Sequence, residues 1–252
     1  MNETMSDPKA NMLRLLADRY ETADFLNGDP SWWMHQVEGE ANREATAFVA
    51  SALSYGSRKQ FMPKIGAIVD MANGDVDRWL RGGMYEERFA AADAACYYRL
   101  YSHGTMRAFF DAYSLLLRRH GTLGAYVERT GDGTGLGAVR VVCEWFARHG
   151  DGHVVPKDST SACKRVCMFL RWMVRGGSPV DLGLWAGFVD RRTLVMPLDT
   201  HVLGEAVAFG LLDSRTASMA TALKLTGKLA AIFPDDPLKG DFALFGLGVD
   251  RN

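Results

Sequence analysis

A lysine and an aspartate, each expected at the start of a helix, are the residues of this chain best suited to chemistry. Lys164 follows Ser161-Ala162-Cys163, and Asp199 stands within Val195-Met196-Pro197-Leu198-Asp199-Thr200-His201. A neutral lysine amine is a nucleophile, and a carboxylate beside it can take up a proton and stabilise a developing positive charge. Together the two groups form the minimal apparatus for cutting a glycosidic bond through an imine.

The sequence predicts that Lys164 opens an amphipathic helix over residues 163–175. One face of this helix is apolar, formed by residues spaced three or four apart: Cys163, Val166, Cys167, Leu170, Met173 and Val174. Lys164, Arg171 and Arg175 fall on the neighbouring stripe, and the polar run 158–161 offers several N-caps, which places the lysine in the first turn. There the helix dipole and the nearby arginines disfavour a charged ammonium. An ordinary solvated surface lysine is the alternative interpretation.

Asp199 is expected at the start of the second helix. Residues 194–196 precede a proline and are predicted to be extended, and Asp199 or Thr200 then caps a helix that runs to Gly210. Upstream, residues 178–181 indicate a helix start, with a short helix to about residue 187. This helix-loop-helix return can bring Asp199 beside Lys164. Capping alone also explains the aspartate, since an N-cap is worth about 1 kcal/mol, and the two roles are compatible.

Other candidate ligand sets are weaker. Cys163 and Cys167 lie one helical turn apart but belong to the apolar face, which favours a core role over metal binding. His201 and Glu205 share a helix face without a third ligand. The glycine-rich run 131–137 resembles a phosphate loop, yet no apolar strand precedes it and no lysine-serine pair follows, so it indicates a flexible connector. No metal and no cofactor is expected.

The elements that must position Lys164 and Asp199 are helices, so an all-α fold is predicted. The chain has 252 residues, of which 48% are hydrophobic, enough for a substantial core. Helical spacing of apolar residues is clearest over 45–53 and 106–117, and the further predicted helices are 10–20, 58–72, 90–101, 138–149, 163–175, 179–187, 200–209 and 216–232. Only residues 154–155 and 194–196 look extended.

Charge and the ends of the chain indicate a soluble cytoplasmic protein with reduced cysteines. The net charge is −1, residues 1–9 lack the apolar core of a leader, and no apolar run is long enough to span a membrane. The charge balance around the candidate site differs from that of the whole chain, because residues 155–195 contain seven basic side chains and three acidic ones. This local excess suits a phosphate-bearing substrate, although a solvated helix face gives the same pattern.

Taken together, these segments resemble the helix-hairpin-helix DNA glycosylase superfamily. Residues 197–202 resemble its aspartate turn, and the long separation of Lys164 from Asp199 is most similar to the archaeal 8-oxoguanine glycosylase branch. Residues 161–175, 197–202 and 241–244 resemble an uncharacterised bacterial family attached to this superfamily, and residues 48–56 resemble the helix before its DNA-inserting loop. The resemblance implies one helical unit over residues 1–252, two-lobed with a central cleft. Residues 40–150 would form mainly one lobe, residues 151–210 the hairpin and catalytic segment, and the termini would complete the second lobe.

The resemblance implies base excision from double-stranded DNA with a damaged base, in the cytoplasm at the nucleoid. A glycosylase with AP lyase activity would flip the damaged nucleotide into a pocket, where Lys164 attacks the sugar and Asp199 assists. The residues implied in DNA binding are Lys157, Arg165, Arg171, Arg191, Arg192 and, as a wedge in the loop after the first helix, Gln60. Trp172, Trp185 and Phe188 are the candidates for the base pocket.

The chain departs from the superfamily in two places. Its hairpin offers Gly152-His153-Val154-Val155-Pro156 where a Gly-x-Gly turn is usual, and the four-cysteine cluster of endonuclease III relatives is missing, so no iron–sulfur cofactor is expected. Two alternatives stay open. One is a non-catalytic DNA- or RNA-binding protein on the same scaffold, and the other is an all-α enzyme acting on a small molecule.

Overall fold

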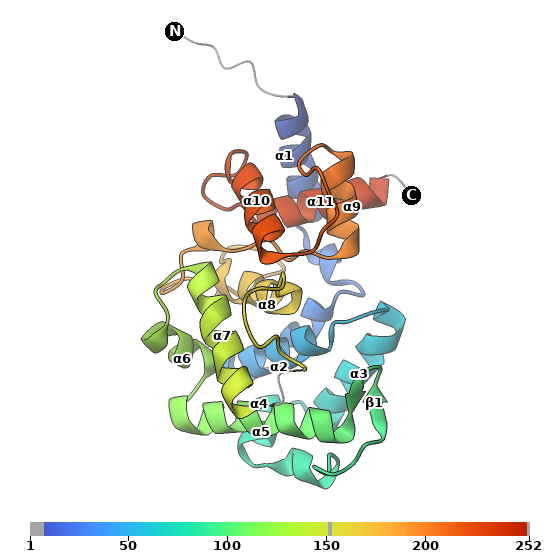
Figure 1. The fold of residues 1–252 in the computed structure, drawn as a ribbon, viewed down its shortest axis with the longest axis vertical. Helices are drawn as coiled ribbons and strands as arrows, with labels where there is room; N and C mark the ends of the chain where they lie inside the picture. The colour runs from blue at the N-terminus through green and yellow to red at the C-terminus, as the bar shows by residue number, and fades with distance from the viewer. Residues whose placement is uncertain (1–7, 151–152, 251–252) are drawn as a thin grey trace.

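The computed structural model describes residues 8–150 and 153–250, and this part of the chain is predominantly helical (Figure 1). The α-helices are α1 (Pro8–Tyr20), α2 (Glu40–Leu53), α3 (Arg58–Met71), α4 (Val76–Arg81), α5 (His103–His120), α6 (Leu123–Thr130), α7 (Gly135–His149), α8 (Lys164–Val174), α9 (Thr200–Ala208), α10 (Met219–Ala230) and α11 (Lys239–Asp250). Short 3-10 helices are η1 (Ala23–Leu26), η2 (Pro30–His35), η3 (Met84–Glu87) and η4 (Arg191–Thr193). Strands β1 (Cys96–Tyr98) and β2 (Tyr101–Ser102) form an antiparallel pair. The predicted all-α class is confirmed.

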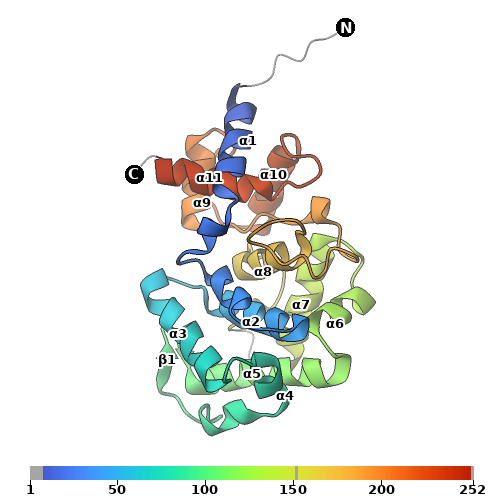
Figure 2. The ribbon, with the colours of Figure 1, turned by 180° about the vertical axis from the view of Figure 1, so that it is seen from behind.

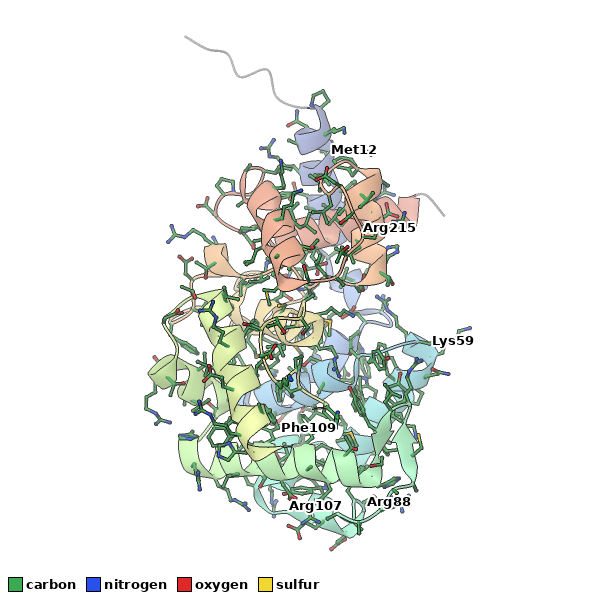
Figure 3. All side chains as sticks on the ribbon, in the orientation of Figure 1. Met12, Lys59, Arg88, Arg107, Phe109 and Arg215 are labelled. Carbon is green, nitrogen blue, oxygen red and sulfur yellow. The ribbon has the colours of Figure 1, made fainter. Side chains whose placement is uncertain are left out.

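Helix α2 runs through the middle of the lower group of helices in Figure 1, with α5, α7 and α8 around it. Phe48 of α2 meets four rings from these neighbours at centroid distances of 4.9 to 5.9 Å: Phe109, Tyr113, Phe146 and Phe169. Rings in such edge-on and tilted contacts bury large apolar areas. In Figure 3, Phe109 lies within this group, whereas Lys59 and Arg215 reach the outer surface. The aromatic cluster therefore fixes α8, and with it Lys164, against α2.

The two ends of the chain pack together at the other end of the molecule. Helix α1 crosses α11, and α9 also packs on α11, as Figure 2 shows from behind. Leu13 and Leu16 of α1 and Leu244 of α11 are buried in this contact region. The segment that carries Asp199 therefore belongs to the upper group of helices, while Lys164 begins a helix that packs on α2.

Two predicted helices are wrong. Residues 90–101 contain β1 and no helix, because Tyr98 pairs with Tyr101 across a short antiparallel hairpin in which both tyrosines are buried. Residues 179–187 contain no helix either. Their N–H groups bond the end of α8, where Leu182 donates to the Trp172 carbonyl at 2.7 Å and Trp185 donates to the Met173 carbonyl at 2.7 Å. This segment thus satisfies the last carbonyls of α8 at the expense of its own helix.

The remaining predicted helices lie within one or a few residues of α1, α2, α3, α5, α7, α8, α9 and α10. Helices α4, α6 and α11 were not predicted. Of the expected hairpin segment, Gly152 lies outside the described residues, and Val154 and Val155 are buried in an irregular segment and form no strand. No helix in the described part of the chain combines the length and apolarity needed to cross a membrane.

Candidate functional site

Asp199 is held at the N-terminus of α9 by contacts on both sides. The preceding residues 194–196 are buried, and the Met196 N–H donates to the Thr226 hydroxyl of α10 at 2.9 Å. One carboxylate oxygen of Asp199, Oδ1, accepts a hydrogen bond from the Val202 N–H at 2.8 Å, as an N-cap does. Because Oδ1 makes the cap, the second oxygen, Oδ2, is left to face α8.

Lys164 is the first residue of α8, but its helix is not capped as the sequence predicted. The polar run before it does not cap α8, since Asp158 accepts a hydrogen bond from the Thr160 N–H at 2.9 Å instead. The N-cap position belongs to Cys163, which has left-handed backbone angles (φ 45°, ψ 35°) and makes no side-chain cap bond. This sharp turn comes directly before Lys164. The helix beyond it is anchored by buried residues such as Phe169.

The structure brings Lys164 and Asp199 together from these two separate helix starts. Lys164 Nζ lies 3.6 Å from Asp199 Oδ2, and the two side chains are 32% and 38% exposed. An ion pair this exposed contributes little to stability, in most cases about 0 to 1 kcal/mol. The pair is thus reachable from solvent and is not a main support of the fold.

Lys164 and Asp199 line a cavity of about 430 Å³. This volume lies within the range of about 300–1,000 Å³ that is typical of small-molecule sites. The walls come from η1, η2, the connection between α2 and α3, α8, α9 and α11, and include Phe25, Asp29, Ser54, Arg58, Phe61, Met168, Arg171, Trp172, His201, Asp241 and Phe245. The lining is therefore partly apolar and aromatic and partly charged, with side chains of both signs.

Two further carboxylates line the cavity, and each has a fixed partner. Asp29 caps η2, accepting from the Ser31 N–H at 3.0 Å and from the Ser31 hydroxyl at 2.6 Å. Asp241 accepts a hydrogen bond from the guanidinium of Arg171, and burial raises the pKa of this carboxyl group. Among the described residues, Lys164 forms an ion pair with Asp199 and with neither of these two carboxylates.

Trp172 supplies an unused hydrogen-bond donor at the cavity. Its side chain is fully buried and lines the cavity, and its indole N–H has no hydrogen-bond partner among the described residues. A buried donor without a partner costs about 1–3 kcal/mol. The indole nitrogen is inaccessible to solvent, so this cost belongs to the interior behind the cavity lining. Trp172 is thus the one predicted base-pocket residue that lies at the Lys164 cavity among the residues described.

The other two predicted pocket aromatics lie elsewhere. Trp185 is buried and donates its indole N–H to the Glu44 carboxylate at 2.8 Å, while Phe188 packs beside it. Glu44 also accepts from the N–H groups of Leu123 and Gly124, at 2.7 and 3.0 Å, and so caps α6. Burial raises the pKa of Glu44 to about 7, although these hydrogen bonds stabilise the carboxylate and lower the pKa. Trp185 and Phe188 therefore pack where α2 meets α6, and they do not line the Lys164 cavity.

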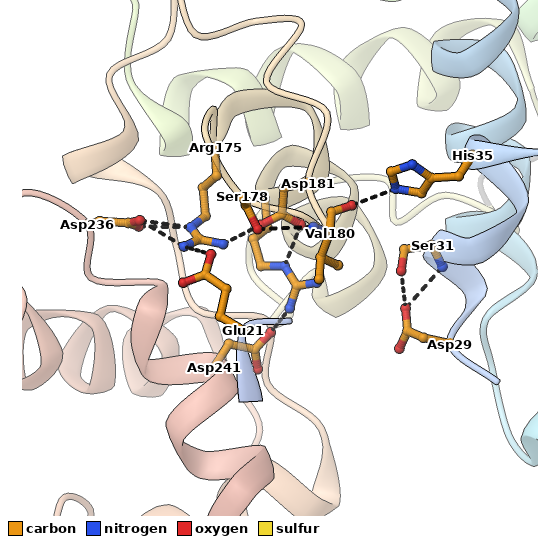
Figure 4. A network of polar contacts seen from close by, with 11 residues as sticks. Glu21, Asp29, Ser31, His35, Arg175, Ser178, Val180, Asp181, Asp236 and Asp241 are labelled. Carbon is orange, nitrogen blue, oxygen red and sulfur yellow. Dashed lines mark hydrogen bonds and ion pairs between the residues drawn. The ribbon is translucent and has the colours of Figure 1, made fainter. Parts of the chain in front are cut away.

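Arg171, which lines the cavity, and Arg175, one helical turn further along α8, are buried among carboxylates from separate segments. Figure 4 shows Arg175 between Glu21, Asp181 and Asp236. The carboxylates are Glu21, Asp181, Asp236 and Asp241. Arg175, 2% exposed, makes a two-pronged contact with Asp236, from Nε to Oδ1 at 2.9 Å and from Nη2 to Oδ2 at 2.8 Å, and donates to Glu21 at 2.6 Å. Arg171 lies 3.3 Å from Asp181. Arg171 is thus enclosed and neutralised, so a phosphate contact through it, as predicted, would require this network to open.

The remaining predicted DNA contacts are dispersed. Arg165 donates to the Ala52 carbonyl at 2.5 Å, and Lys157 is exposed. Arg191 donates to the Asp235 carbonyl at 2.9 Å beside a separate hollow near Arg175, and Arg192 pairs with Asp190 on the surface. Gln60 was predicted in a loop, but it lies exposed in the first turn of α3.

Several cavity residues escaped the sequence analysis. Phe25, Asp29 and Arg58 reach the cavity from 3-10 helices or from the start of α3, where apolar periodicity gives no signal. The one usable signal is Asp29-Pro30, which is typical of a capped helix start. Asp241 was noted as part of a resemblance and not as a site residue.

Two of the four cysteines, Cys143 and Cys163, form a buried thiol pair, and Cys163 directly precedes Lys164. Cys143 Sγ lies 4.0 Å from Cys163 Sγ, and none of the four cysteines forms a disulfide. The hydrogen bond with Cys143 lowers the pKa of the Cys163 thiol to about 7. Over residues 8–150 and 153–250, no three His, Cys, Asp or Glu side chains gather in a way that could hold a metal ion.

Comparison with known proteins identifies a family. A family model described as "Protein of unknown function (DUF2400)" matches residues 29–250, so the chain belongs to that family. No curated protein and no solved structure matches it. The matched span includes Asp29, Lys164, Asp199 and Asp241, but the family description names no activity.

Proposed function

We propose that this member of the DUF2400 family is a DNA base-excision enzyme, a glycosylase with AP lyase activity that works through an imine on Lys164. The observation that supports the proposal is the approach of Lys164 Nζ to Asp199 Oδ2, 3.6 Å, at the wall of an open cavity of about 430 Å³. An amine and a carboxylate in contact, reachable by a ligand and with little value for stability, are suited to nucleophilic catalysis.

In the proposed reaction, Asp199 takes a proton from the Lys164 ammonium, and the neutral amine attacks C1′ of the sugar. A C–N bond forms as the bond from C1′ to the base breaks, and the electron pair leaves with the base, which takes up a proton. Asp199 stabilises the positive charge that develops on the sugar. The Lys164 nitrogen then gives up a proton, the bond from C1′ to the ring oxygen O4′ breaks, and O4′ takes up a proton, which leaves a protonated imine on Lys164. A water molecule removes a proton from C2′, and the bond from C3′ to the 3′ phosphate breaks with its electron pair on the phosphate, which cuts the strand. Water finally hydrolyses the imine and frees the lysine amine.

The cavity offers groups that suit an extruded base. Phe25 and Phe245 provide aromatic surface. Asp29, which also lines the cavity, can accept from a base amino or imino group. A flipped nucleotide would thus find a stacking surface and a hydrogen-bond acceptor in the cavity of the reacting pair.

The phosphates would be bound at the rim. Arg58 lines the cavity, is exposed, and has only a long contact of 3.7 Å with Asp29, so its guanidinium can turn to a phosphate. Lys59 beside it is exposed as well. Because each neutralised phosphate releases counterions, binding of duplex DNA should weaken as salt rises.

Borohydride trapping tests the proposal. The wild-type protein should form a covalent adduct with duplex DNA that carries abasic sites or a damaged base, and Lys164→Ala should abolish it. Abasic sites also form imines with exposed amines, so Lys228→Ala, at an exposed lysine of α10, is the matched control and should retain the adduct. A wild-type protein that traps nothing across a panel of lesions, or an adduct that survives in Lys164→Ala, would overturn the proposal.

A measurement of DNA and RNA binding at several salt concentrations, made beside the trapping experiment, distinguishes the other functions left open by the sequence. Salt-sensitive binding of DNA or RNA without trapping would indicate a nucleic-acid-binding protein on this scaffold. A protein without affinity for DNA at low salt would instead indicate an enzyme for a small molecule. Base removal from one duplex of the panel, lost in Lys164→Ala, would identify the lesion.

A further inference from the structure

Two buried thiols meet at the turn that leads into Lys164. Cys143 lies in α7, Cys163 directly precedes α8, and the two helices pack side by side (Figure 1). Both cysteines are buried, and their Sγ atoms lie 4.0 Å apart. The two sulfur atoms of a disulfide are about 2 Å apart. A movement of about 2 Å would therefore join Cys143 to Cys163.

The surroundings of the pair make Cys163 its more reactive thiol. Cys163 Sγ contacts the Cys143 thiol and, at 3.5 Å, the Ser161 hydroxyl, and these hydrogen bonds lower the pKa of Cys163 to about 7. The thiolate is the form that reacts with oxidants. Cys167, one helical turn further along α8, is the opposite case, because burial raises the pKa of its thiol. Cys163 is thus the first thiol of this group to react.

Only a thin layer of chain separates Cys163 from solvent. Residues 153–162, which lead into α8, form no helix or strand. Cys163 Sγ lies 3.3 Å from the Asp158 carbonyl oxygen, and Ser161, whose hydroxyl it contacts, is exposed. A hydrogen peroxide molecule is little larger than water, so it has a short way to this sulfur atom. A bulky oxidant such as oxidised glutathione is kept out.

Closure of the pair would act on Lys164. Cys143 stands inside α7, where the helix on both sides fixes it, whereas Cys163 occupies the N-cap position of α8 and makes no side-chain cap bond. The movement therefore falls mainly on Cys163, which is joined to Lys164 by a peptide bond. Lys164 Nζ lies 3.6 Å from Asp199 Oδ2. A misplacement of about 1 Å in a reacting group can cost about 100-fold in rate.

We propose that Cys143 and Cys163 form a redox switch of the Lys164 site, in which hydrogen peroxide joins the two thiols as a disulfide and so draws Lys164 away from Asp199. This inference rests on the proposed function and adds a regulation of its site. The 4.0 Å contact, the uncapped turn at Cys163 and the peptide bond between Cys163 and Lys164 carry it.

The oxidation proceeds in two balanced steps. The Cys163 thiolate attacks hydrogen peroxide, an S–O bond forms as the O–O bond breaks, and the departing hydroxide takes up the proton that Cys163 gave off. The Cys143 thiol then attacks the sulfur of this sulfenic acid, an S–S bond forms as the S–O bond breaks, and the hydroxide leaves with the Cys143 proton. The two thiols lose two electrons, and one peroxide is reduced to two water molecules.

Peptide mapping tests whether the disulfide forms. The reduced wild-type protein is freed of reductant, treated with hydrogen peroxide, alkylated and digested. Mass spectrometry should then find a peptide pair that joins Cys143 to Cys163 and has lost two hydrogens. Cys96→Ser, which removes the exposed cysteine, is the matched control and should give the same disulfide. In Cys143→Ser the disulfide should be absent, and Cys163 should be found as a sulfenic acid captured by dimedone.

DNA trapping tests the effect on Lys164, with cyanoborohydride as the reductant because it leaves disulfides intact. Trapping of the wild-type protein on duplex with an abasic site should fall about tenfold or more after peroxide treatment, and dithiothreitol should restore it. Restoration excludes oxidised methionine as the cause, since methionine sulfoxide needs its own reductases. Cys143→Ser should trap to the same extent before and after peroxide.

The outcomes separate this inference from the proposed function. A wild-type protein that forms no disulfide between Cys143 and Cys163, or a disulfide that leaves trapping unchanged, overturns the switch, while trapping that depends on Lys164 leaves the catalytic proposal standing. Both results come from the wild-type protein and do not depend on the folding of a variant. A reduced protein that traps nothing overturns the proposed function and the regulation with it, and peptide mapping still decides whether the two thiols are joined.

Discussion

Replacement of Arg175 by methionine should destabilise the protein strongly. The arginine is 2% exposed and neutralises Glu21, Asp181 and Asp236, which lie on three separate segments. Methionine fills part of the space but leaves these carboxylates without their shared cation. Removal of one partner from a buried ion pair costs about 3–5 kcal/mol. For a chain of this size each kcal/mol lowers Tm by about 2–4 °C, so a decrease of about 6–20 °C is expected.

Arg192→Met is the matched control for this prediction. Arg192 makes a similar two-pronged contact with Asp190, at 3.0, 3.0 and 2.7 Å, but both side chains are on the surface. Its removal should cost less than about 1 kcal/mol. Urea unfolding at pH 7 and calorimetry measure both variants. Equal costs for Arg175→Met and Arg192→Met would refute the reasoning, because burial would then have no influence on the value of the pair.

Acid pH gives an independent check of Arg175→Met. In this variant the buried carboxylates lack their cation and favour the protonated form, so the variant gains stability relative to the wild type as pH falls. The difference in unfolding free energy between the two proteins should therefore shrink from pH 7 to pH 4. A difference that stays the same on acidification would contradict the electrostatic explanation and would indicate lost packing instead, because packing does not depend on protonation.

Three further predictions follow from the site and its supports. Asp199→Asn keeps an N-cap, so unfolding free energy should change by less than about 0.5 kcal/mol, while turnover on lesion-containing duplex should fall about 100-fold or more; unchanged turnover would remove the aspartate from the reaction. The pKa of Glu44 is raised from 4.5 to about 7, so its stabilising contribution is complete below about pH 4.5 and is lost as pH rises through 7. Relative to Glu44→Gln, the wild type should thus lose about 2.5 kcal/mol between pH 5 and 8, and a pH-independent difference in unfolding curves would contradict this. Gly135→Ala places a Cβ 2.6 Å from the Thr193 carbonyl oxygen and should cost about 1–3 kcal/mol in urea unfolding; Gly187→Ala, with open space around it, is the control and should cost much less.

The helices that the sequence predicted correctly are those with a long apolar face. Helices α5 and α7 bury residues at helical spacing over most of their length, so periodicity alone identifies them. Helices α4 and α6 have six and eight residues, too few for a period to appear. Helix α11 contains Gly240, Gly246 and Gly248, which weaken a helical pattern in sequence. These three helices form because their neighbours pack on them.

The two wrong helices have a common physical cause, which is a tertiary hydrogen bond or packing contact that outweighs local pattern. Tyr97 has helical spacing relative to its neighbours, yet its hydroxyl donates to the Lys64 carbonyl of α3 at 2.9 Å and its ring packs there in a hairpin. Asp181 was read as part of a capped helix start, but it pairs with Arg171 and Arg175 in the interior. The sequence contains no indication of which arginine meets which aspartate.

The predicted excess of positive charge around the site depends on residues far away in the chain. Arg171 and Arg175 account for two of the seven cations between residues 155 and 195, and carboxylates at positions 21, 236 and 241 neutralise them in the folded protein. The charge available to a phosphate backbone therefore resides in exposed arginines and lysines at the rim, such as Arg58 and Lys59, which lie outside that window. The buried arginines have a different effect. They hold α8 to the segments that follow α1 and precede α11, and this fixes Lys164 opposite Asp199 although the two belong to different groups of helices.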